Sequence, residues 1–422
     1  MFDQIQRTDV GIGPYTISIY SNYFIVCKKE IGYMSAKLKY AIIGIGNMGS
    51  AHINMYTNGE IKEMELVAVC DIKQDRLDFA LEKVPGVQTF TSTDELFDSG
   101  LVDAVIIATP HYLHPVLSKQ ALEKGINVLC EKPAGVFTKD VRELNEYVKT
   151  QDKTFALMYN QRTNHIYRKV KELVESGVYG EIRRTNWIIT DWYRTQGYYN
   201  SGGWRATWDG EGGGVLMNQA PHNLDLWQWI CGMPSKITAF CHNGKWHDIE
   251  VEDDVTIYAE YPNGATGVFI TTTGDCPGDN RLEITLDKAR IICSASELEV
   301  VELSEKISDY TYAAEDGFAK LESKKIEVET DGMNEQHSGV TNAFAAHILH
   351  GTPLVAEGVE GINGLTICNA AYLSSWLGNV PVNLPLDEDL YLEELNKRRA
   401  TSKAKKDVTE TVAADMSSTF GS

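Results

Sequence analysis

The feature that most constrains the fold of this chain is a glycine-rich turn directly after a run of apolar residues. The turn, Gly44-Ile45-Gly46-Asn47-Met48-Gly49, follows the strand-like segment 40–43 and precedes a segment with helical periodicity. Asp71 ends the next apolar run, at about the 20-residue spacing typical of this pattern. A strand, a G-x-G-x-x-G turn, a helix and a later acidic residue together indicate a βαβ unit that binds a dinucleotide.

The residues of this turn have separate roles in such a site. Glycine permits a tight turn, a close approach of the backbone to a pyrophosphate, and close packing of helix on strand. We expect cofactor contacts from Gly44, Gly46, Asn47, Met48 and Gly49. Asp71 can accept hydrogen bonds from ribose hydroxyls and would repel a 2′-phosphate, which favours NAD over NADP, although Lys73 can pair with such a phosphate. The alternative is a structural glycine turn without a nucleotide.

The first half of the chain alternates short apolar runs with helix-like stretches, as parallel βαβ units do. We predict strands at 40–43, 66–70, 104–108, 127–130 and 155–158, and helices near 50–56, 75–84, 115–123 and 139–150. The prediction is a doubly wound α/β Rossmann domain over residues 37–159. Residues 1–36 show no clear periodicity and are interpreted as an N-terminal extension.

Beyond residue 160 the pattern changes to alternating, aromatic-rich segments separated by turn pairs such as Asn263-Gly264. This pattern predicts an antiparallel α+β domain over residues 160–386. We expect strands at 184–190, 236–241, 254–261, 265–272, 281–285 and 289–293, and helices near 342–349 and 362–377. Residues 387–422 form a predicted tail that is disordered from about Leu395, because few large apolar residues follow.

Composition excludes several classes of partner. The chain has 39 Lys plus Arg against 59 Asp plus Glu, a net charge of −20, so a nucleic acid is not expected to bind. No apolar run reaches the roughly 18 residues that a membrane span requires. The eight cysteines form no C-x-x-C pair, which is typical of a reducing cytoplasm. His242 and His247 lack the spacing of a metal site, so no metal is predicted.

Polar residues follow two further strands at their carboxyl ends, where ligands of open α/β sheets bind. Thr109-Pro110 with His114 follows one strand, and Glu131-Lys132-Pro133 follows the next. We expect further cofactor contacts from Thr109, Pro110, His114, Glu131 and Lys132. Lys132 can donate to a substrate hydroxyl, with its pKa lowered by burial. The alternative for Lys132 is a surface side chain paired with Glu131.

His222 is the side chain best suited to act as a base near neutral pH. Asn218 lies four residues earlier and Asp225 three later, and Asp225 can orient the imidazole from behind. The alternative for Asp225 is an exposed carboxylate or a helix cap. Pro221 predicts a kink or a helix start at that point, so only the spacing from His222 to Asp225 is firmly helical.

An aromatic and arginine-rich stretch precedes the triple glycine 212–214. Aromatic faces stack on sugar rings, and arginine donates to hydroxyls or anionic groups, so the stretch predicts a wall of the substrate site. The expected substrate contacts are Trp192, Arg194, Tyr199, Trp204, Arg205, Asn218 and His222. Packing in the core or at a subunit interface is the alternative for about half of the aromatics.

Taken together, the glycine turn, Ala108-Thr109-Pro110, Glu131-Lys132-Pro133 and the triple glycine followed by His222 and Asp225 resemble the Gfo/Idh/MocA family of oxidoreductases. The resemblance implies a C-terminal domain with a large, mostly antiparallel open sheet whose outer face joins subunits into a dimer or tetramer. It also implies that Lys132 and His222 are catalytic and that Asn160 and Arg162 lie near the cofactor. Family members carry Asp where this chain has Asn218, which cannot take a proton.

The resulting prediction is a cytoplasmic, NAD-dependent oxidoreductase acting on a ring hydroxyl of a sugar, glycoside or inositol, with His222 as base and Lys132 and Asn218 assisting. Restoring Asp at position 218 is expected to be tolerated or to shift the pH profile. Two alternatives stay open: an NAD-dependent glycosidase or lyase that oxidises the ring only transiently, and a non-catalytic NAD-binding partner subunit.

Overall fold

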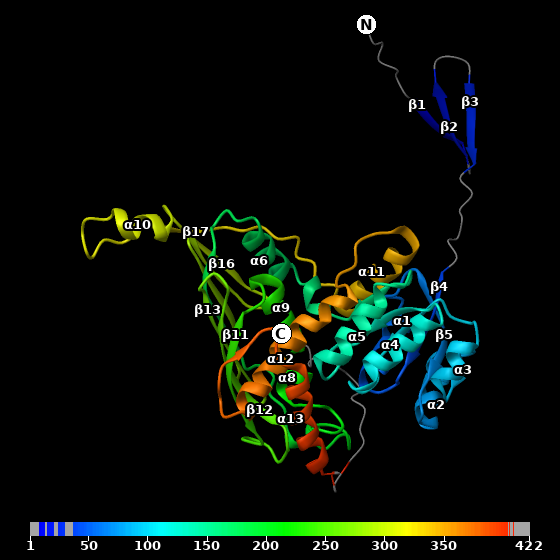
Figure 1. Ribbon diagram of the computed structural model, residues 1–422. Helices are drawn as coiled ribbons and strands as arrows, with labels where there is room; N and C mark the ends of the chain where they lie inside the picture. Colours follow the sequence, from blue (N-terminus) through cyan, green and yellow to red (C-terminus); the bar gives the residue numbers. More distant parts are fainter. Residues whose placement is uncertain are drawn as a thin grey trace. The chain divides into compact units, whose positions relative to one another are not determined.

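The computed structural model describes residues 8–12, 15–20, 24–29, 37–403, 405 and 408, and it divides into units 1–37 and 38–422. The first unit is an antiparallel sheet of three strands, β1 (Thr8–Ile12), β2 (Tyr15–Tyr20) and β3 (Phe24–Lys29), labelled in Figure 1. The sequence predicted no regular element here. Residues 1–7, 13–14, 21–23 and 30–36 of the predicted extension lie outside the described residues.

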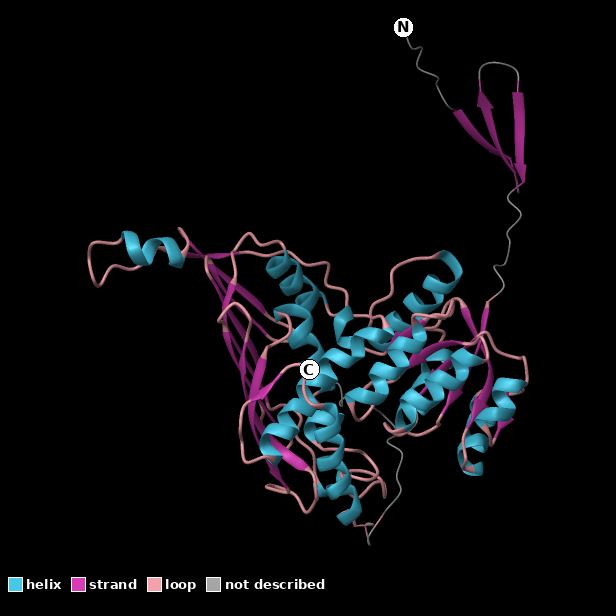
Figure 2. Ribbon diagram, in the orientation of Figure 1, coloured by secondary structure: helices cyan, strands magenta, loops and turns pink. Residues whose placement is uncertain are grey.

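The second unit begins with a parallel sheet of six strands in the order β6-β5-β4-β7-β8-β9, which is the Rossmann order. Its strands are β4 (Leu38–Ile43), β5 (Met64–Cys70), β6 (Gln88–Phe90), β7 (Ala104–Ile107), β8 (Asn127–Cys130) and β9 (Phe155–Leu157). Between them run α1 (Asn47–Thr57), α2 (Gln74–Lys83), α3 (Thr93–Asp98), α4 (Leu113–Glu123) and α5 (Thr138–Val148), drawn around the strands in Figure 2. This confirms the predicted α/β Rossmann domain.

The chain then forms a sheet of nine strands in the order β17-β16-β15-β14-β10-β13-β12-β11-β18, in which the β10–β13 pair is parallel and every other pair is antiparallel. This confirms the predicted, mostly antiparallel sheet. The strands are β10 (Ile182–Ile189), β11 (Lys236–Asn243), β12 (Glu252–Glu260), β13 (Thr266–Thr272), β14 (Asn280–Leu286), β15 (Ala289–Cys293), β16 (Leu298–Leu303), β17 (Ser323–Ile326) and β18 (Val382–Asn383).

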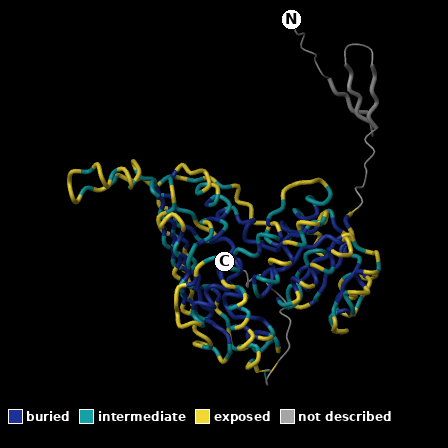
Figure 3. The backbone as a smooth tube through the Cα atoms, viewed as in Figure 1, coloured by how far each residue is buried: buried dark blue, intermediate teal, exposed yellow. Residues whose placement is uncertain are grey.

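Helices cover one face of this large sheet, as Figure 1 shows. They include α6 (His165–Glu175), α9 (Pro221–Cys231) and α12 (Gly361–Trp376), and Trp227 of α9 is buried with Trp187 and Phe269 of the sheet. Buried residues gather where helices and strands meet, whereas the segment around α10 (Ile307–Ala313) is largely exposed (Figure 3). Among the described helices, none is both long enough and apolar enough to span a membrane.

Helix α11 (Gln336–His350) returns to the parallel sheet from the second half of the chain. Its residues Val340 and Phe344 are buried in one cluster with Ile42 and Ile53 of the dinucleotide-binding domain. Asn342 adds hydrogen bonds to the backbone of residues 60 and 62. The core of the first domain is therefore completed by residues far beyond the boundary predicted at 159.

The end of the described chain contains α13 (Glu388–Thr401), so the prediction of disorder from about Leu395 is wrong as far as Thr401. Tyr391 and Leu395, spaced by one helical turn, are both fully buried. The guanidinium of Arg398 lies 4.0 Å from the ring centroid of Trp376. Residues 409–422 of the predicted tail lie outside the described ones.

Truncation should distinguish the two ends of α13. Removing everything after Leu386 deletes buried Tyr391 and Leu395, and we expect a loss of about 3–6 kcal/mol in the free energy of unfolding. Removing everything after Lys397 keeps both side chains and should cost only about 1 kcal/mol, mainly the Arg398 contact with Trp376. Thermal unfolding of the two truncated proteins measures the difference, and equal losses would contradict it.

Candidate active site

The glycine turn lies at the crevice between β4 and β7, where the strand order reverses. Gly44 has φ +86°, and a Cβ there would meet the carbonyl oxygen of Ala108 at 2.8 Å. A Cβ on Gly49 would collide with the carbonyl of Gly44, whereas the Cβ position of Gly46 has no atom within 4 Å. The turn therefore packs tightly on one side and leaves open space beside Gly46, which fits a pyrophosphate at the N-terminus of α1.

Asp71 stands beside this turn at the end of β5. Its Oδ2 accepts a hydrogen bond from Ile45 N at 2.6 Å, and its Oδ1 accepts one from Lys73 N at 2.9 Å. The carboxylate is thus fixed next to the glycine turn, in the position where a ribose diol binds in this type of fold.

The cofactor preference can be tested at Asp71. Asp71→Ser should reduce the preference for NADH over NADPH about tenfold or more, because the charge that repels a 2′-phosphate is removed. Dissociation constants for both dinucleotides, measured by fluorescence, give the ratio directly. Asp75→Ser, which changes the same side chain in the first turn of α2, is the control and should leave the ratio unchanged. A wild-type protein that binds NADPH more tightly would contradict the prediction.

Glu131 and Lys132 follow β8 and point to different partners. Glu131 is buried, and its Oε1 lies 2.8 Å from Nε2 of His52 on α1. Burial alone would raise the pKa of Glu131, but His52 lowers it to about 2. Lys132 Nζ instead donates to the main-chain oxygen of Asn218 at 2.8 Å, and burial lowers its pKa. The alternative of a surface Lys132 paired with Glu131 is therefore wrong.

His114 joins the two turns that follow β7 and β8. Its Nδ1 lies 2.7 Å from the carbonyl oxygen of Pro133, and its Nε2 lies 2.7 Å from that of Thr109. Both ring nitrogens are thus occupied by the protein, so the predicted contact of His114 with the cofactor is replaced by a structural role. The hydroxyl of Thr109 is buried without a hydrogen-bond partner in the described structure.

His222 lies in the first turn of α9, which begins at Pro221, so the proline starts a helix rather than kinking one. Asn218 belongs to a separate short helix, α8 (Val215–Asn218). The His222 ring is 5% exposed, and its Nδ1 has no hydrogen-bond partner among the described residues. Burial, together with the charges of Lys132 and His337, holds the pKa of His222 well below its usual value. The imidazole is therefore neutral at neutral pH, as a base must be.

Asp225 does not orient His222, and this prediction is wrong. Its two carboxylate oxygens accept from Nη2 and Nε of Arg162, at 2.7 and 2.8 Å. Arg162 also pairs with Glu360, so its donors are engaged inside the protein and the predicted cofactor contact of Arg162 is not supported. Asn160, also fully buried, donates to the side chain of Gln336 at the start of α11, and its Oδ1 has no partner among the described residues.

Two of the predicted substrate contacts are core residues. Trp192 is buried and donates to Asn223 Oδ1 at 3.1 Å, and Tyr199 is buried with its hydroxyl 2.7 Å from Thr273 Oγ1. The packing alternative holds for both of them. Apolar area drives these rings inward, and their polar atoms find partners there.

Arg205 and Trp204 form a different arrangement, a stack in which Arg205 is buried and Trp204 is half-buried. The guanidinium of Arg205 lies 4.4 Å from the ring centroid of Tyr198 and 4.8 Å from that of Trp204. The Trp204 ring lies edge-on to His111, at 6.0 Å between centroids. Arg194 lies close by, with its guanidinium 5.2 Å from the Tyr198 centroid. The structure thus brings Arg194, Trp204 and Arg205 together, and their contact with a substrate stays a prediction.

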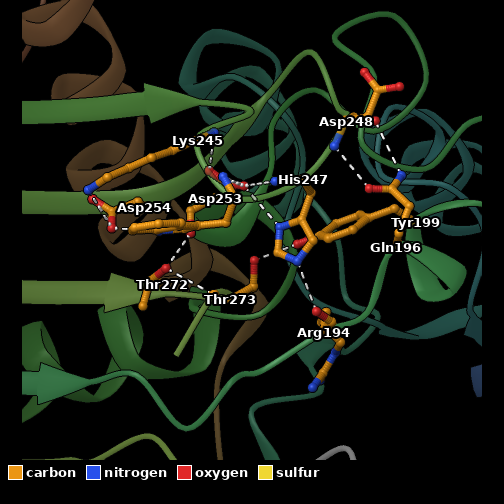
Figure 4. Close-up of polar contacts among 12 residues, drawn as sticks. Arg194, Gln196, Tyr199, Lys245, His247, Asp248, Asp253, Asp254, Thr272 and Thr273 are labelled. Atoms are coloured by element: carbon orange, nitrogen blue, oxygen red, sulfur yellow. Dashed lines mark hydrogen bonds and ion pairs between the residues drawn. The ribbon is translucent and has the colours of Figure 1, made fainter. Parts of the chain in front are cut away.

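A buried histidine and aspartate, both absent from the predicted site, hold the wall in place. His247 Nδ1 lies 2.9 Å from Asp253 Oδ2, and Nε2 lies 2.9 Å from the carbonyl oxygen of Arg194, as drawn in Figure 4. Asp253 also accepts from the backbone nitrogens of Lys245 and Trp246. The cluster fastens the Arg194 segment to the β11–β12 connection. No motif identifies it, because its members are assembled by the sheet.

Glu252 holds the triple-glycine turn in a similar way. Its carboxylate accepts from Gly214 N and Leu216 N, both at 2.9 Å, and from the Tyr372 hydroxyl at 2.7 Å. Burial raises the pKa of Glu252 to about 7.

Within the part of the chain that the structure describes, no group of three or more His, Cys, Asp or Glu side chains is arranged to hold a metal ion.

Comparison with known proteins finds a family model for each of two consecutive parts of the chain. The family model "Oxidoreductase family, NAD-binding Rossmann fold" matches residues 38–159, and "GFO/IDH/MocA C-terminal domain" matches residues 167–292. An uncharacterized oxidoreductase of Streptococcus pneumoniae is 28% identical, with 54% of this chain and 60% of that protein covered. An inositol 2-dehydrogenase of Corynebacterium glutamicum is 32% identical, with 55% of this chain and 66% of that protein covered. The chain thus spans less than two thirds of the length of these curated relatives.

Among solved structures, the WlbA dehydrogenase of Chromobacterium violaceum, in complex with NADH and UDP-GlcNAcA, superimposes with a TM-score of 0.71 and 26% identity. The superposition covers 84% of this chain and 98% of that one. The matches confirm the predicted NAD-binding Rossmann domain. With its glycine turn, Glu-Lys-Pro turn and large sheet in these positions, the chain belongs to the Gfo/Idh/MocA family of oxidoreductases.

Proposed function

We propose that the protein is an NAD-dependent dehydrogenase that oxidises a ring hydroxyl of a sugar, glycoside or inositol, with His222 as the base. The observation that carries the proposal is the buried His222 ring, whose Nδ1 has no hydrogen-bond partner among the described residues. Lys132 lies in the same region, with its ammonium 2.8 Å from the main-chain oxygen of Asn218, three residues before the start of α9.

The residues of this chain supply binding and proton transfer. The glycine turn and Asp71 would hold NAD, which supplies a hydride acceptor when bound. Lys132, which is partly buried, donates a hydrogen bond to the substrate oxygen and favours its loss of a proton. Neutral His222 accepts that proton. Aromatic faces at Tyr198 and Trp204 stack on the C–H side of the ring, and Arg205 donates to its substituents.

The substrate class is supported from two directions. The stack of Arg205 on aromatic rings suits a flat, polyhydroxylated ring. The relatives named above include an inositol 2-dehydrogenase and a dehydrogenase bound to UDP-GlcNAcA, so ring-shaped polyols and sugar derivatives are the first candidates for this chain.

A substrate screen tests the proposal. Purified protein is incubated with NAD or NADP and a panel of sugars, inositols and glycosides, and NADH absorbance is followed. We expect lasting NADH formation with at least one member of the panel and none with His222→Ala. Product release without lasting absorbance would instead establish the transient oxidation of a glycosidase or lyase. Binding of NAD with no reaction of any panel member would favour the non-catalytic partner.

We also propose that subunits associate through the uncovered face of the large sheet. Ile188, Phe240 and Tyr258 are exposed there on neighbouring or nearby strands, and exposed apolar groups of this kind mark protein interfaces. Light scattering should report a dimer or tetramer. The double variant Phe240→Lys/Tyr258→Lys should shift the measured mass toward that of the monomer, whereas an unchanged mass would contradict the proposal.

A further inference from the structure

Glu211 is a buried carboxylate that touches Asn218, the residue at the position where the family resemblance implies Asp. Its side chain is 1% exposed and lies just before the triple-glycine turn. Its Oε2 accepts from Ala206 N at 2.5 Å, and its Oε1 accepts from Nδ2 of Asn218. Because an ionised carboxylate only accepts hydrogen bonds, the NH₂ end of the Asn218 amide must face Glu211. The carbonyl end, Oδ1, is therefore directed away from Glu211.

We propose that Glu211 is a positioning residue that determines which end of the Asn218 amide is offered to the substrate, and that its carboxylate is the reason for Asn at position 218. The substrate part of this proposal rests on the function proposed above. With the amide fixed, Asn218 presents an acceptor to the substrate hydroxyl beside the donor Lys132. An Asp at 218 would instead place two carboxylates in hydrogen-bond contact, and like charges at that distance cannot both ionise.

The charges around this pair favour one carboxylate but not two. Arg205 Nη1 lies 3.8 Å from Glu211 Oε1, and Lys132 Nζ lies 2.8 Å from the main-chain oxygen of Asn218. The other polar or charged groups that face the pair are the Tyr198 hydroxyl, His111 and Lys405. Burial raises the pKa of Glu211, and Arg205, Ala206 N and the Asn218 amide oppose that rise. Asn218→Asp removes one of these opposing contacts and adds a negative charge.

A double-mutant cycle that needs no substrate tests the coupling. We expect Asn218→Asp to lose about 5 °C of Tm relative to wild type between pH 5 and pH 8. The sign follows from linkage: the shared proton is held in the folded protein above the pKa of the unfolded carboxyl, so stability falls as pH rises. In Glu211→Gln/Asn218→Asp the introduced glutamine amide can donate to the new carboxylate while its oxygen still accepts from Ala206 N. The double variant should regain most of the loss.

Asn223→Asp is the matched control. This Asn is also buried, but its Oδ1 accepts from Trp192, a bond that Asp retains. Any pH-dependent loss in Asn223→Asp should be independent of Glu211→Gln. If the effects of Glu211→Gln and Asn218→Asp on Tm are additive, as for the control, the proposal is overturned.

Turnover gives the second readout once a substrate is known. Glu211→Gln alone permits the Asn218 amide to flip and should lower kcat/KM about tenfold, and Asn218→Asp should be impaired most at high pH. The kcat/KM of the double variant should recover to within about threefold of the wild-type value, because the acid and the amide have exchanged positions. Lack of recovery would overturn the positioning role. Absence of turnover in wild type would refute the proposed function, while the Tm cycle would still decide the role of Glu211.

Discussion

Replacing His222 by alanine is expected to lower kcat by roughly 100-fold or more with little change in the affinity for NAD, because proton transfer in the transition state is lost. Lys132→Ala should have a similar effect, since its ammonium is the partly buried donor bonded to the main-chain oxygen of Asn218. Steady-state kinetics and NADH binding measure the two quantities separately. His350→Ala, which removes an exposed histidine paired with Glu63, is the control and should leave kcat within about twofold.

The pH profile makes this assignment sharper. A base must be unprotonated to act, and burial and neighbouring cations lower the pKa of His222. The rise of log(kcat/KM) with pH should therefore lie at lower pH than the range of about 6 to 8 typical of an unperturbed histidine base. If His222→Ala keeps normal turnover and the wild-type profile, the base is Lys132 or a group outside this assignment.

Asp225→Ala should destabilise the protein by about 3–5 kcal/mol, because it leaves the guanidinium of Arg162 buried without its main partner. Arg162 and Asp225 have side chains only 3% and 1% exposed and share a bidentate ion pair. Urea denaturation measures the loss. Asp389→Asn, which breaks a solvent-exposed pair with Lys139, is the control and should leave the free energy of unfolding nearly unchanged.

A double variant tests whether the loss comes from leaving one charge buried without a partner. Arg162→Met with Asp225→Leu removes both charges, and replacing a buried pair by apolar groups of similar size is often close to neutral. The double variant should therefore be more stable than Asp225→Ala. A single variant as stable as wild type would show that the ion pair does not carry the packing of α9 against the Arg162 segment.

The parts of the site that sequence predicts well are those decided by local backbone geometry. The glycine turn is such a case, because the positive φ of Gly44 and the close packing of Gly49 leave no room for a side chain. The partner of Asp225 is a different case: helical spacing places it on one face with His222 but cannot reveal that Arg162 lies behind it. The prediction for Tyr199 is wrong because an aromatic ring suits a core as well as a sugar.

Glu211 and α13 show two further limits of reading a single sequence. Glu211 stands among glycines and polar residues in a pattern typical of a loop, and only the folded chain brings its carboxylate to Asn218. For α13, the sequence does contain a signal: Tyr391 and Leu395 are one turn apart, and Asp387 caps the helix by accepting from Leu390 N. In the prediction from sequence, the charged composition of the segment outweighs that helix signal, because such composition is typical of disordered segments.

The return of α11 to the parallel sheet has a consequence for how the protein is made. Until Val340 and Phe344 leave the ribosome, the core cluster of Ile42 and Ile53 lacks the part that α11 contributes, although every strand of that sheet has already been synthesised. At ordinary elongation rates that interval is on the order of 10 s, long compared with collapse of the chain. The nascent dinucleotide-binding domain is therefore expected to be a client of chaperones, and a fragment ending at residue 159 should aggregate when expressed alone.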